Sequence, residues 1–376
     1  MSRRALALLV LTLTLLLVAL STGTTAYYLL FLMLLFLLLG GFLSALSALF
    51  LTRAQVILPR SQVVRGDSVS VRVSVRRGSP LPIGQLELKM AASGTRTLGW
   101  MTISLPPMHA REYRYSVACP HRGLCEVGVS ALRVTDVFGL FTLRRRVRDG
   151  GGEVTVLPRV SREGETMPIE PGENGPQARI RMTEDTSSPA GVRTWQEGDE
   201  LKKVHWKLSM RKRELMVRTY EESARPDTLV LLDLSPVSAT ASQVASLEDR
   251  LCEAAGEAVF AQLRAGYPVR MPLHSQQPTE LSAQFPAQFE PILSRLAFVQ
   301  FDCPDPFEQI LALETRRMQR TGGVVLVTSR LSSQTADFAL RMRQQGLMVR
   351  VCLVSSASGE SQELLAQLAT QGVQAG

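Results

Sequence analysis

The 376-residue chain has no lysine or arginine between Ala5 and Thr52, although its formal net charge is +8. Within that stretch, Ala5 to Leu20 and Leu29 to Leu51 are apolar runs separated only by the segment STGTTAYY. The second run is long enough to cross a hydrocarbon core of about 30 Å as a helix. The apolar residues are therefore not spread over ordinary globular domains, and we predict a two-helix transmembrane hairpin over residues 1–53.

Basic residues flank the hairpin at both ends: Arg3, Arg4, Arg53, Arg60 and Arg65. The positive-inside rule then places both termini in the cytoplasm of a bacterial cell, with the hairpin in the inner membrane. An alternative is that the first run is a cleaved signal peptide, since it has a basic start, an apolar core and small residues near Ala26. The second run would still return the chain to the cytoplasm.

Cysteine is scarce, with five residues: Cys119, Cys125, Cys252, Cys303 and Cys352. In a reducing cytoplasm they are expected to be free thiols, and none has the surroundings of a thiol hydrolase or transglutaminase nucleophile. The segment CPHRGLC offers Cys119, His121 and Cys125 as zinc ligands. It lacks a fourth ligand at zinc-finger spacing and contains a proline, so we predict a structural turn there.

From Ala54 onward the apolar residues alternate with polar ones. SVSVRVSVRR, QLELKM, EYRYSVAC and EVGVSALRV each repeat this pattern, with Gly, Pro and Ser between them. A period of two indicates strands with one buried face, which predicts an antiparallel β-sandwich over residues 54–160. Residues 161–190 are rich in Glu, Gly, Pro, Ser and Thr, and we predict a mobile linker.

Residues 191–376 change to alternating strands and helices. TLVLLDLS, GGVVLVTS and LMVRVCLV are short apolar runs typical of strands covered on both faces, and residues at helical spacing lie between them. This order predicts an α/β, doubly wound domain with a mainly parallel sheet. Ligands of such domains bind beyond the carboxyl ends of the strands, which directs attention to the residues after LVLL.

Asp233 and Ser235 stand at that place, in DLSPVS. The pattern resembles the way von Willebrand factor A domains hold a divalent ion such as Mg²⁺, which prefers hard oxygen ligands. Position 237 is a valine, however, and the later strand ends in Thr328 to Arg330, without the Asp of the family pattern. With so few ligands a complete magnesium site is not expected, and the alternative is that Asp233 and Ser235 cap a helix or satisfy the strand end.

The most unusual stretch is GDELKKVHWKLSMRKREL, from Gly198 to Leu215. Apolar positions at i, i+3, i+4 and i+7, from Leu201 to Leu208, predict a helix with one apolar face that includes His205. Asp199 is a suitable N-cap for this helix. The following ELMVRTYEE reads as a strand able to join the α/β sheet.

Four functions compete for this stretch. Basic residues and Trp206 suit nucleic acid, but interleaved acidic residues and a membrane tether argue against it, so no nucleic-acid partner is expected. His205 is a candidate general base, although its helical position favours a packing role. Thiol chemistry lacks a suitable cysteine. A docking element with exposed charges remains, and no assembled catalytic constellation indicates an enzyme.

At this stretch the residues resemble the signature of the prokaryotic domain-of-unknown-function family fifty-eight. The matching positions are Gly198, Asp199, His205, Trp206, Lys207, Ser209, Arg211, Glu214, Leu215, Tyr220 and Glu221. Departures are small, such as Val204 in place of Ile and Met210 in place of Ala. A second motif, HRGLCEVGVSALRVTDVFGLF, is also similar to the family; its matching positions are Arg122, Gly123, Asp136, Phe138, Gly139, Leu140 and Phe141.

The resemblance implies a membrane-anchored β-sandwich protein with a von Willebrand A-like domain, encoded beside MoxR-type AAA ATPases and often beside transglutaminase-like membrane proteins. It implies no established activity. We therefore predict a cytoplasm-facing adaptor of a MoxR-type ATPase, active in assembly or maturation of envelope proteins, with no cofactor. The alternative is a divalent-metal-dependent ligand-binding or hydrolytic site at Asp233.

Overall fold

The computed structural model describes most of the chain, in eleven segments. These are residues 3–58, 61–93, 99–147, 151–161, 167–170, 189–196, 204–220, 226–237, 241–318, 321–354 and 359–375. The chain forms two compact units, Met1–Leu157 and Pro158–Gly376. Each unit is considered by itself below.

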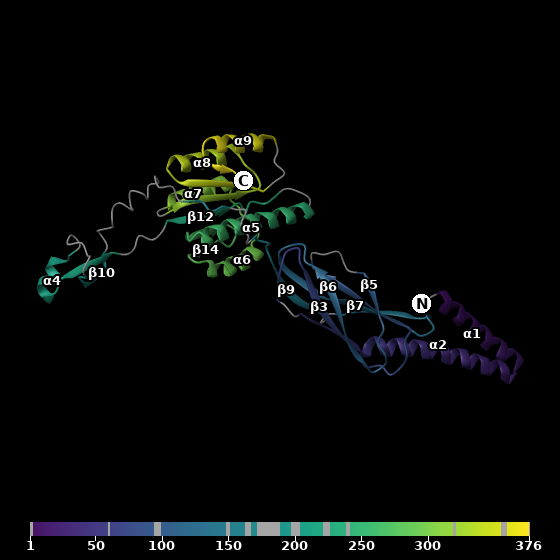
Figure 1. Ribbon diagram of the computed structural model, residues 1–376. Helices are drawn as coiled ribbons and strands as arrows, with labels where there is room; N and C mark the ends of the chain where they lie inside the picture. The colour runs from purple at the N-terminus through teal and green to yellow at the C-terminus, as the bar shows by residue number, and fades with distance from the viewer. Residues whose placement is uncertain are drawn as a thin grey trace. The chain divides into compact units, whose positions relative to one another are not determined.

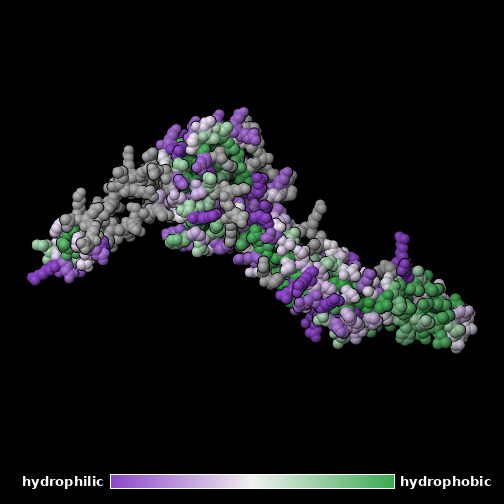
Figure 2. Space-filling model, in the orientation of Figure 1, coloured by the Kyte–Doolittle hydropathy of each residue, from purple (hydrophilic) through white to green (hydrophobic). Residues whose placement is uncertain are grey.

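The first unit begins with two long apolar helices, α1 (Arg3–Thr22) and α2 (Thr25–Leu51) (Figure 1). Both are long and apolar enough to cross a membrane, and Figure 2 shows their surface as mostly hydrophobic. Gly23, at φ +67°, makes the tight connection between them, a backbone conformation that favours glycine. The predicted pair of long apolar helices is confirmed.

The rest of the first unit is β-rich, as predicted, and consists of two sheets. One contains β1 (Thr52–Ile57), β3 (Ser68–Arg77) and β6 (Ala110–Ala118) in that order. The other has the order β2 (Gln62–Val64), β9 (Gly151–Leu157), β7 (Gly123–Thr135), β4 (Gln85–Ala92) and β5 (Trp100–Ile103), with β8 (Thr142–Arg146) also paired to β7.

Side-chain alternation explains how these sheets pack. Val69, Val71, Val73 and Val75 of β3 are buried, and they share one core with residues of β4, β7 and β9. Each second residue faces that core because successive strand side chains point to opposite faces. The prediction of an antiparallel arrangement fails at one pair of strands, because β2 pairs with β9 in parallel.

The second unit contains a six-stranded mixed sheet. Its order is β14 (Thr279–Ala283), β13 (Val269–Leu273), β12 (Asp227–Leu232), β15 (Thr321–Thr328), β16 (Met348–Leu353) and β17 (Gln374–Ala375). All pairings are parallel except that of β13 with β14. The apolar runs of the sequence form its central strands, β12 and β15, as expected of strands covered on both faces.

Helices cover both faces of this sheet. On one face lie α5 (Ala241–Arg264) and α6 (Phe289–Phe298), which follows the short 3-10 helix η2 (Pro286–Gln288). On the other lie α7 (Phe307–Arg317), α8 (Ser333–Gln344) and α9 (Gly359–Thr370) (Figure 1). Residues of α7, α8 and α9 share a core with β12, β15 and β16. The strand and helix alternation predicted from the sequence is confirmed.

Part of the predicted 161–190 linker packs on this sheet. Ile169 is 1 % exposed, and its side chain lies where a Cβ on Gly323 of β15 would meet it at 3.3 Å. Just before the linker, the Arg159 amide donates to Glu253 of α5 at 3.0 Å. Residues 167–170 are therefore docked, in contrast to the mobile linker expected there; the rest of 162–188 lies outside the described residues.

The strand after the signature helix does not join the six-stranded sheet. Met216–Tyr220 forms β11, which pairs antiparallel with β10 (Pro189–Thr194) in a separate two-stranded sheet. The prediction that this strand extends the α/β sheet is wrong. The sequence of Met216–Tyr220 predicts a strand but does not specify its partner, which in the structure is the antiparallel strand β10.

Candidate functional site

Asp233 follows β12 at the carboxyl edge of the sheet, where β12 lies between β13 and β15. The chain leaves β12 first toward β13 and later returns to β15, so this edge is a topological switch point, the usual ligand site of such sheets. Asp233 is 6 % exposed. Its Oδ2 accepts a 2.7 Å hydrogen bond from the Thr328 hydroxyl, and its Oδ1 accepts one of 3.0 Å from the Ser235 amide.

These contacts assign structural roles to the predicted ligands. Ser235 contributes its backbone N–H to Asp233, and the carboxylate links the ends of β12 and β15. Arg330 adds a positive charge nearby, since its guanidinium donates to the Pro236 carbonyl at 3.0 Å. In the described part of the chain, no three His, Cys, Asp or Glu side chains are grouped as metal ligands. Asp233 is thus a single carboxylate whose oxygens both accept hydrogen bonds.

Sequence reasoning overlooked the hydroxyl of Thr328, because it searched that strand end for an acid. Thr328 Oγ1 also accepts from the Arg330 amide at 3.1 Å, so one hydroxyl organises the turn after β15. Cys303 lies near the same edge, with its amide donating to the Leu234 carbonyl at 3.1 Å. Burial raises the pKa of the Cys303 thiol, with a smaller contribution from neighbouring aspartates. A thiol so protonated is a poor nucleophile.

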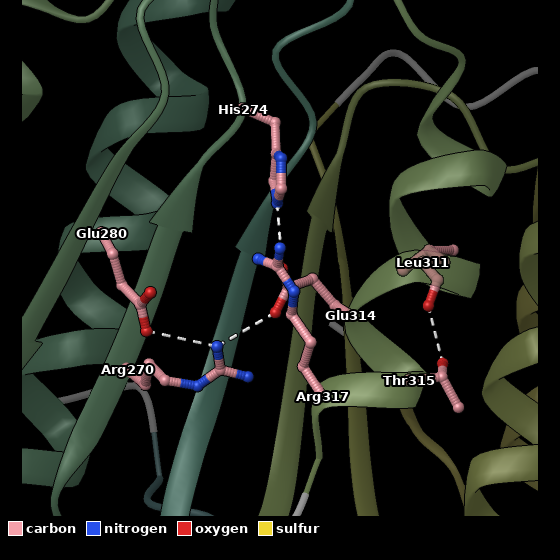
Figure 3. Close-up of polar contacts among 7 residues, drawn as sticks. All are labelled: Arg270, His274, Glu280, Leu311, Glu314, Thr315 and Arg317. Carbon is pink, nitrogen blue, oxygen red and sulfur yellow. Dashed lines mark hydrogen bonds and ion pairs between the residues drawn. The ribbon is translucent and has the colours of Figure 1, made fainter.

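A second cluster of charges lies between helix α7 and strands β13 and β14 of the α/β sheet (Figure 3). The Glu314 carboxylate on α7 is fully buried, with Arg270 Nη1 of β13 at 3.1 Å and His274 Nε2 at 3.3 Å. Arg317 Nη1 lies 3.3 Å from Glu314, and Arg270 Nη1 lies 3.3 Å from Glu280 of β14. This network connects three elements. A buried carboxylate requires such partners, because an unpaired charge away from water is strongly unfavourable.

The signature motif forms a shorter helix than predicted. Helix α4 spans Trp206–Lys212, and His205 is its N-cap, with the ring Nδ1 accepting from the Leu208 amide at 3.2 Å. Val204 instead bridges to Val217 of β11. The prediction of a helix through Val204 and His205 is therefore wrong. Gly198, Asp199 and Glu221 lie outside the described residues, so the predicted Asp199 cap does too.

Ser209 fastens α4 to β11. Its hydroxyl oxygen accepts from the Met216 amide at 2.8 Å, and the same hydroxyl lies 3.1 Å from the His205 carbonyl. The His205 amide in turn donates to the Met216 carbonyl at 2.8 Å. His205 and Ser209 are thus explained by local folding. Tyr220 lies in β11, and its side chain is outside the described set.

Other signature side chains point outward. Trp206 is 60 % exposed and Met210 is 81 % exposed, and they stand at i and i+4, where helix side chains are neighbours. Leu215 is also exposed. The remaining matching positions are charged and exposed: Lys207, Arg211 and Glu214. We call Trp206, Lys207, Met210 and Arg211 the α4 surface.

The second motif is a tight turn built around Asp136, which is 1 % exposed. Its Oδ1 accepts from the Phe141 amide at 2.7 Å and its Oδ2 from the Phe138 amide at 3.1 Å. Gly139 has φ +68°, which suits glycine at this turn. Gly84 approaches the backbone of Asp136 so closely that a Cβ there would lie 2.5 Å from its carbonyl oxygen.

This turn contacts the apolar hairpin. The Phe141 ring packs edge-on against Phe42 of α2 with centroids 5.6 Å apart, and Leu140 clusters with Ala5 and Leu38. Phe138 remains 54 % exposed. The structure thus unites the second motif with α1 and α2, a contact that no local sequence pattern indicated.

The upstream end of the second motif lies at the opposite end of β7. Gly123, at φ +107°, begins this strand, and Arg122 precedes it. Cys119 and Cys125 are both buried free thiols. Burial, reinforced by the nearby Cys125 thiol, raises the pKa of Cys119 to about 11. Residues 119–122 connect β6 to β7.

Taken together, the chain combines two long apolar helices, a β-rich region and a mixed α/β sheet with parallel strands. Residues 191–364 match the family described as "Protein of unknown function DUF58". It is 24 % identical over 339 residues to the uncharacterized protein YeaD of Bacillus subtilis (strain 168), an alignment that covers 84 % of this chain and 80 % of YeaD.

Similar solved structures are more remote. A CARDB domain from Pyrococcus furiosus is 12 % identical, with 28 % of this chain and 87 % of that chain covered and a TM-score of 0.22. The sporulation control protein Spo0M of Bacillus subtilis is 14 % identical, with 39 % and 58 % covered and a TM-score of 0.18. Likenesses at such scores carry no argument about function.

Proposed function

We propose that the protein is a membrane-anchored, cytoplasm-facing adaptor that recognises a protein partner through its α4 surface. The observation that carries this proposal is the exposure of Trp206 and Met210 side by side on one short helix. Exposed aromatic and methionine side chains are enriched in the cores of protein interfaces. Lys207 and Arg211, also four residues apart, add positive charge beside them, which suits a partner with an apolar pocket flanked by acidic groups.

The anchor is the α1 and α2 hairpin, spanning the bacterial inner membrane. Arg3 and Arg4 at the start of α1 and Arg53 after α2 orient it with both ends in the cytoplasm. The length and apolar composition of both helices support this assignment. A reporter active only in the periplasm, fused after Gly376, is expected to stay silent; activity would contradict the orientation.

The partner we propose is a MoxR-type AAA ATPase, on the strength of the family resemblance. In this arrangement the α/β region acts as a von Willebrand A-like binding domain, and the ATPase supplies energy for assembly or maturation of envelope proteins. A transglutaminase-like membrane protein is a further candidate member of the complex. The adaptor itself needs no catalytic group in this scheme.

The experiment is co-purification of the detergent-solubilised full chain with a MoxR-type ATPase of the same genome, with ATP, with ADP and without nucleotide. The proposal predicts association in at least one nucleotide state. A double variant, Trp206→Ser with Met210→Ser, should lose it, whereas Met108→Ser, which removes an exposed methionine elsewhere, should retain it. Absence of wild-type association in all three conditions would contradict the proposal.

A divalent-metal-dependent ligand-binding or hydrolytic site at Asp233 is the second candidate, favoured by the position of Asp233 at the switch point of the sheet. For Mg²⁺ to bind, the carboxylate must exchange its contacts with Thr328 and Ser235 for the ion. Calorimetry with Mg²⁺ and Mn²⁺ on wild type and Asp233→Ala tests this. Saturable heat that disappears in the variant supports the site, and no heat in wild type removes it.

A further inference from the structure

Helix α2 is longer than the hydrocarbon core of a membrane. Its 27 residues correspond to about 40 Å at 1.5 Å per residue, compared with a core of about 30 Å. Helix α1 has 20 residues, and Ala5 near its start clusters with Leu38 of α2. The start of α1, marked by Arg3 and Arg4, therefore lies close to the level of Leu38. The ten residues after Gly41 extend beyond the level at which α1 begins.

Two loops of the β-rich region contact α2 at this level. The Ser44 hydroxyl donates to the Pro82 carbonyl, and the Ser47 and Ser79 hydroxyls lie 2.9 Å apart. On the Asp136 turn, Phe141 packs on Phe42. A Cβ on Gly41 would lie only 3.0 Å from Asp136 Oδ2, so the turn contacts the helix closely there. We call residues 78–84 and 136–141 the collar.

The collar exposes apolar side chains and no charged ones. Leu81 is 41 % exposed, Val137 is 50 % exposed and Phe138 is 54 % exposed. The segments GSPLPIG and DVFGLF contain a single charged residue, Asp136, which is buried and accepts two backbone hydrogen bonds. Of these side chains, Phe138 borders the hairpin, since a Cβ on Gly41 of α2 would lie 3.8 Å from its ring.

We propose that the collar inserts into the lipid bilayer, with Leu81, Val137 and Phe138 at the boundary between headgroups and acyl chains. This inference rests on the proposed membrane span of α1 and α2. The bilayer is the occupant that fits, because the collar contacts α2 just beyond the level at which α1 begins with Arg3 and Arg4. Lipid insertion would fix the orientation of the β-rich region on the membrane, rather than leave it on a flexible tether.

The test uses the full chain reconstituted into vesicles of phosphatidylethanolamine and phosphatidylglycerol, with nitroxide labels on introduced cysteines. Phe138→Cys reports on the collar, and Leu124→Cys is the matched control, since Leu124 is similarly exposed at 48 % but lies at the other end of β7. Met33→Cys on α2 reports on the span itself. Wild-type chain treated with the same reagent corrects for labelling of native thiols.

Collision of each label with oxygen and with a water-soluble nickel chelate gives its depth. The Phe138 label is expected about 5–10 Å into the headgroup and acyl boundary, as for interfacial apolar side chains. The Leu124 label should be fully accessible to nickel, and the Met33 label should be deeper than both. A nickel-accessible Phe138 label with a deep Met33 label overturns the collar proposal alone. A nickel-accessible Met33 label overturns the span and the collar together.

Contact between two copies of the chain is the competing explanation of an apolar collar. Dipolar broadening between Phe138 labels, relieved by dilution with unlabelled protein, would reveal it and would contradict lipid insertion. A second variant guards against misfolding by the label. Val137→Ser with Phe138→Ser retains Asp136 and should leave thermal unfolding in detergent unchanged while making a label at Leu81 more accessible to nickel.

Discussion

The signature motif and the second motif are used differently in the fold. In the Asp136 turn, most motif side chains are used within the unit: the carboxylate is buried, and Leu140 and Phe141 contact the apolar helices, while Phe138 is exposed. In α4, Ser209 is buried whereas Trp206 and Met210 face outward. The second motif therefore keeps most of its side chains within its own region and exposes Phe138, whereas the signature motif divides its residues between local folding and the α4 surface.

This difference separates two explanations for a family pattern. A motif residue with all its contacts inside the chain is explained by folding, as Asp136 and Ser209 are. A large apolar residue that remains exposed beside others of its kind is not, since burial in the chain would have stabilised it by roughly 1.5–3 kcal/mol. Trp206 is a motif residue of this second kind, and Met210, which departs from the signature, is exposed beside it. This exposed pair supports the assignment of the α4 surface to a partner.

The largest loss of unfolding free energy is expected at Glu314, a fully buried carboxylate outside both motifs. Glu314→Gln leaves His274 without its carboxylate partner and Arg270 with only the exposed Glu280, and breaking such a buried pair is expected to cost about 3–5 kcal/mol of unfolding free energy. Calorimetric unfolding of the full chain measures this. The matched control is Glu280→Gln, because Glu280 contacts the same arginine but is 55 % exposed; equal losses for the two variants would contradict the network.

Asp136→Ala should give the largest loss among the motif positions. Two backbone N–H groups would lose a charged acceptor, at a cost of about 3 kcal/mol or more. Chemical or thermal unfolding of the detergent-solubilised chain reports this loss. Glu112→Ala, which removes an exposed carboxylate from β6, should change stability by no more than about 0.5 kcal/mol. A similarly small loss of stability in Asp136→Ala would contradict the role of Asp136 in stabilising the turn.

Cys119 makes the upstream end of the second motif sensitive to alkali. Its folded-state pKa of about 11 lies above that of an unfolded thiol, so the folded state holds the proton more tightly. The resulting stability is present below about pH 8.5 and is lost as pH rises toward 11. Comparing unfolding midpoints of wild type and Cys119→Ala over this range checks the sign. Parallel pH curves would disprove it.

Ser209→Ala should have a moderate effect on the α4 region. It leaves the buried Met216 amide without its acceptor, a loss of about 1–2 kcal/mol. His205→Ala, which removes the cap of α4, should cost about 1 kcal/mol. Amide hydrogen exchange of α4 and β11 measures both locally. Exchange unchanged in both variants would mean that these bonds do not hold α4 to β11.

The smallest stability effect is expected at the α4 surface itself. Trp206→Ser with Met210→Ser removes two outward side chains and should change unfolding free energy by no more than about 0.5 kcal/mol per position, as for surface substitutions. The measurement is the same hydrogen exchange. Marked loosening of α4 would show that these side chains serve folding, which would remove the distinction between the two motifs.

Much of the fold could be predicted from the sequence because it depends on local periodicity. The apolar runs of α1 and α2, the alternation in β3 and the helical spacing in α5 each indicate one structure. Helix α4 was misjudged because Val204 and His205 also fit helical spacing, whereas pairing of Val204 with Val217 depends on a contact thirteen residues away. The burial of Glu314 was not predictable, since an acidic residue on an amphipathic helix is ordinarily exposed.

The candidate sites divide in the same way. The position of Asp233 at the sheet edge followed from the strand pattern. Its bond to Thr328 did not, because it joins residues 95 positions apart. Likewise, the family resemblance pointed to Asp136 and Phe141, but no local sequence pattern indicated that they contact α2.

The proposed binding of a MoxR-type ATPase to the α4 surface can be measured as the affinity of the ATPase for the full chain. Binding of the ATPase to immobilised full chain would be measured for wild type and for Trp206→Ser with Met210→Ser, in the nucleotide state that gives association. We expect the variant to bind the ATPase at least about 10-fold more weakly, which corresponds to about 1.4 kcal/mol of binding free energy. Equal affinities for the two proteins would contradict it.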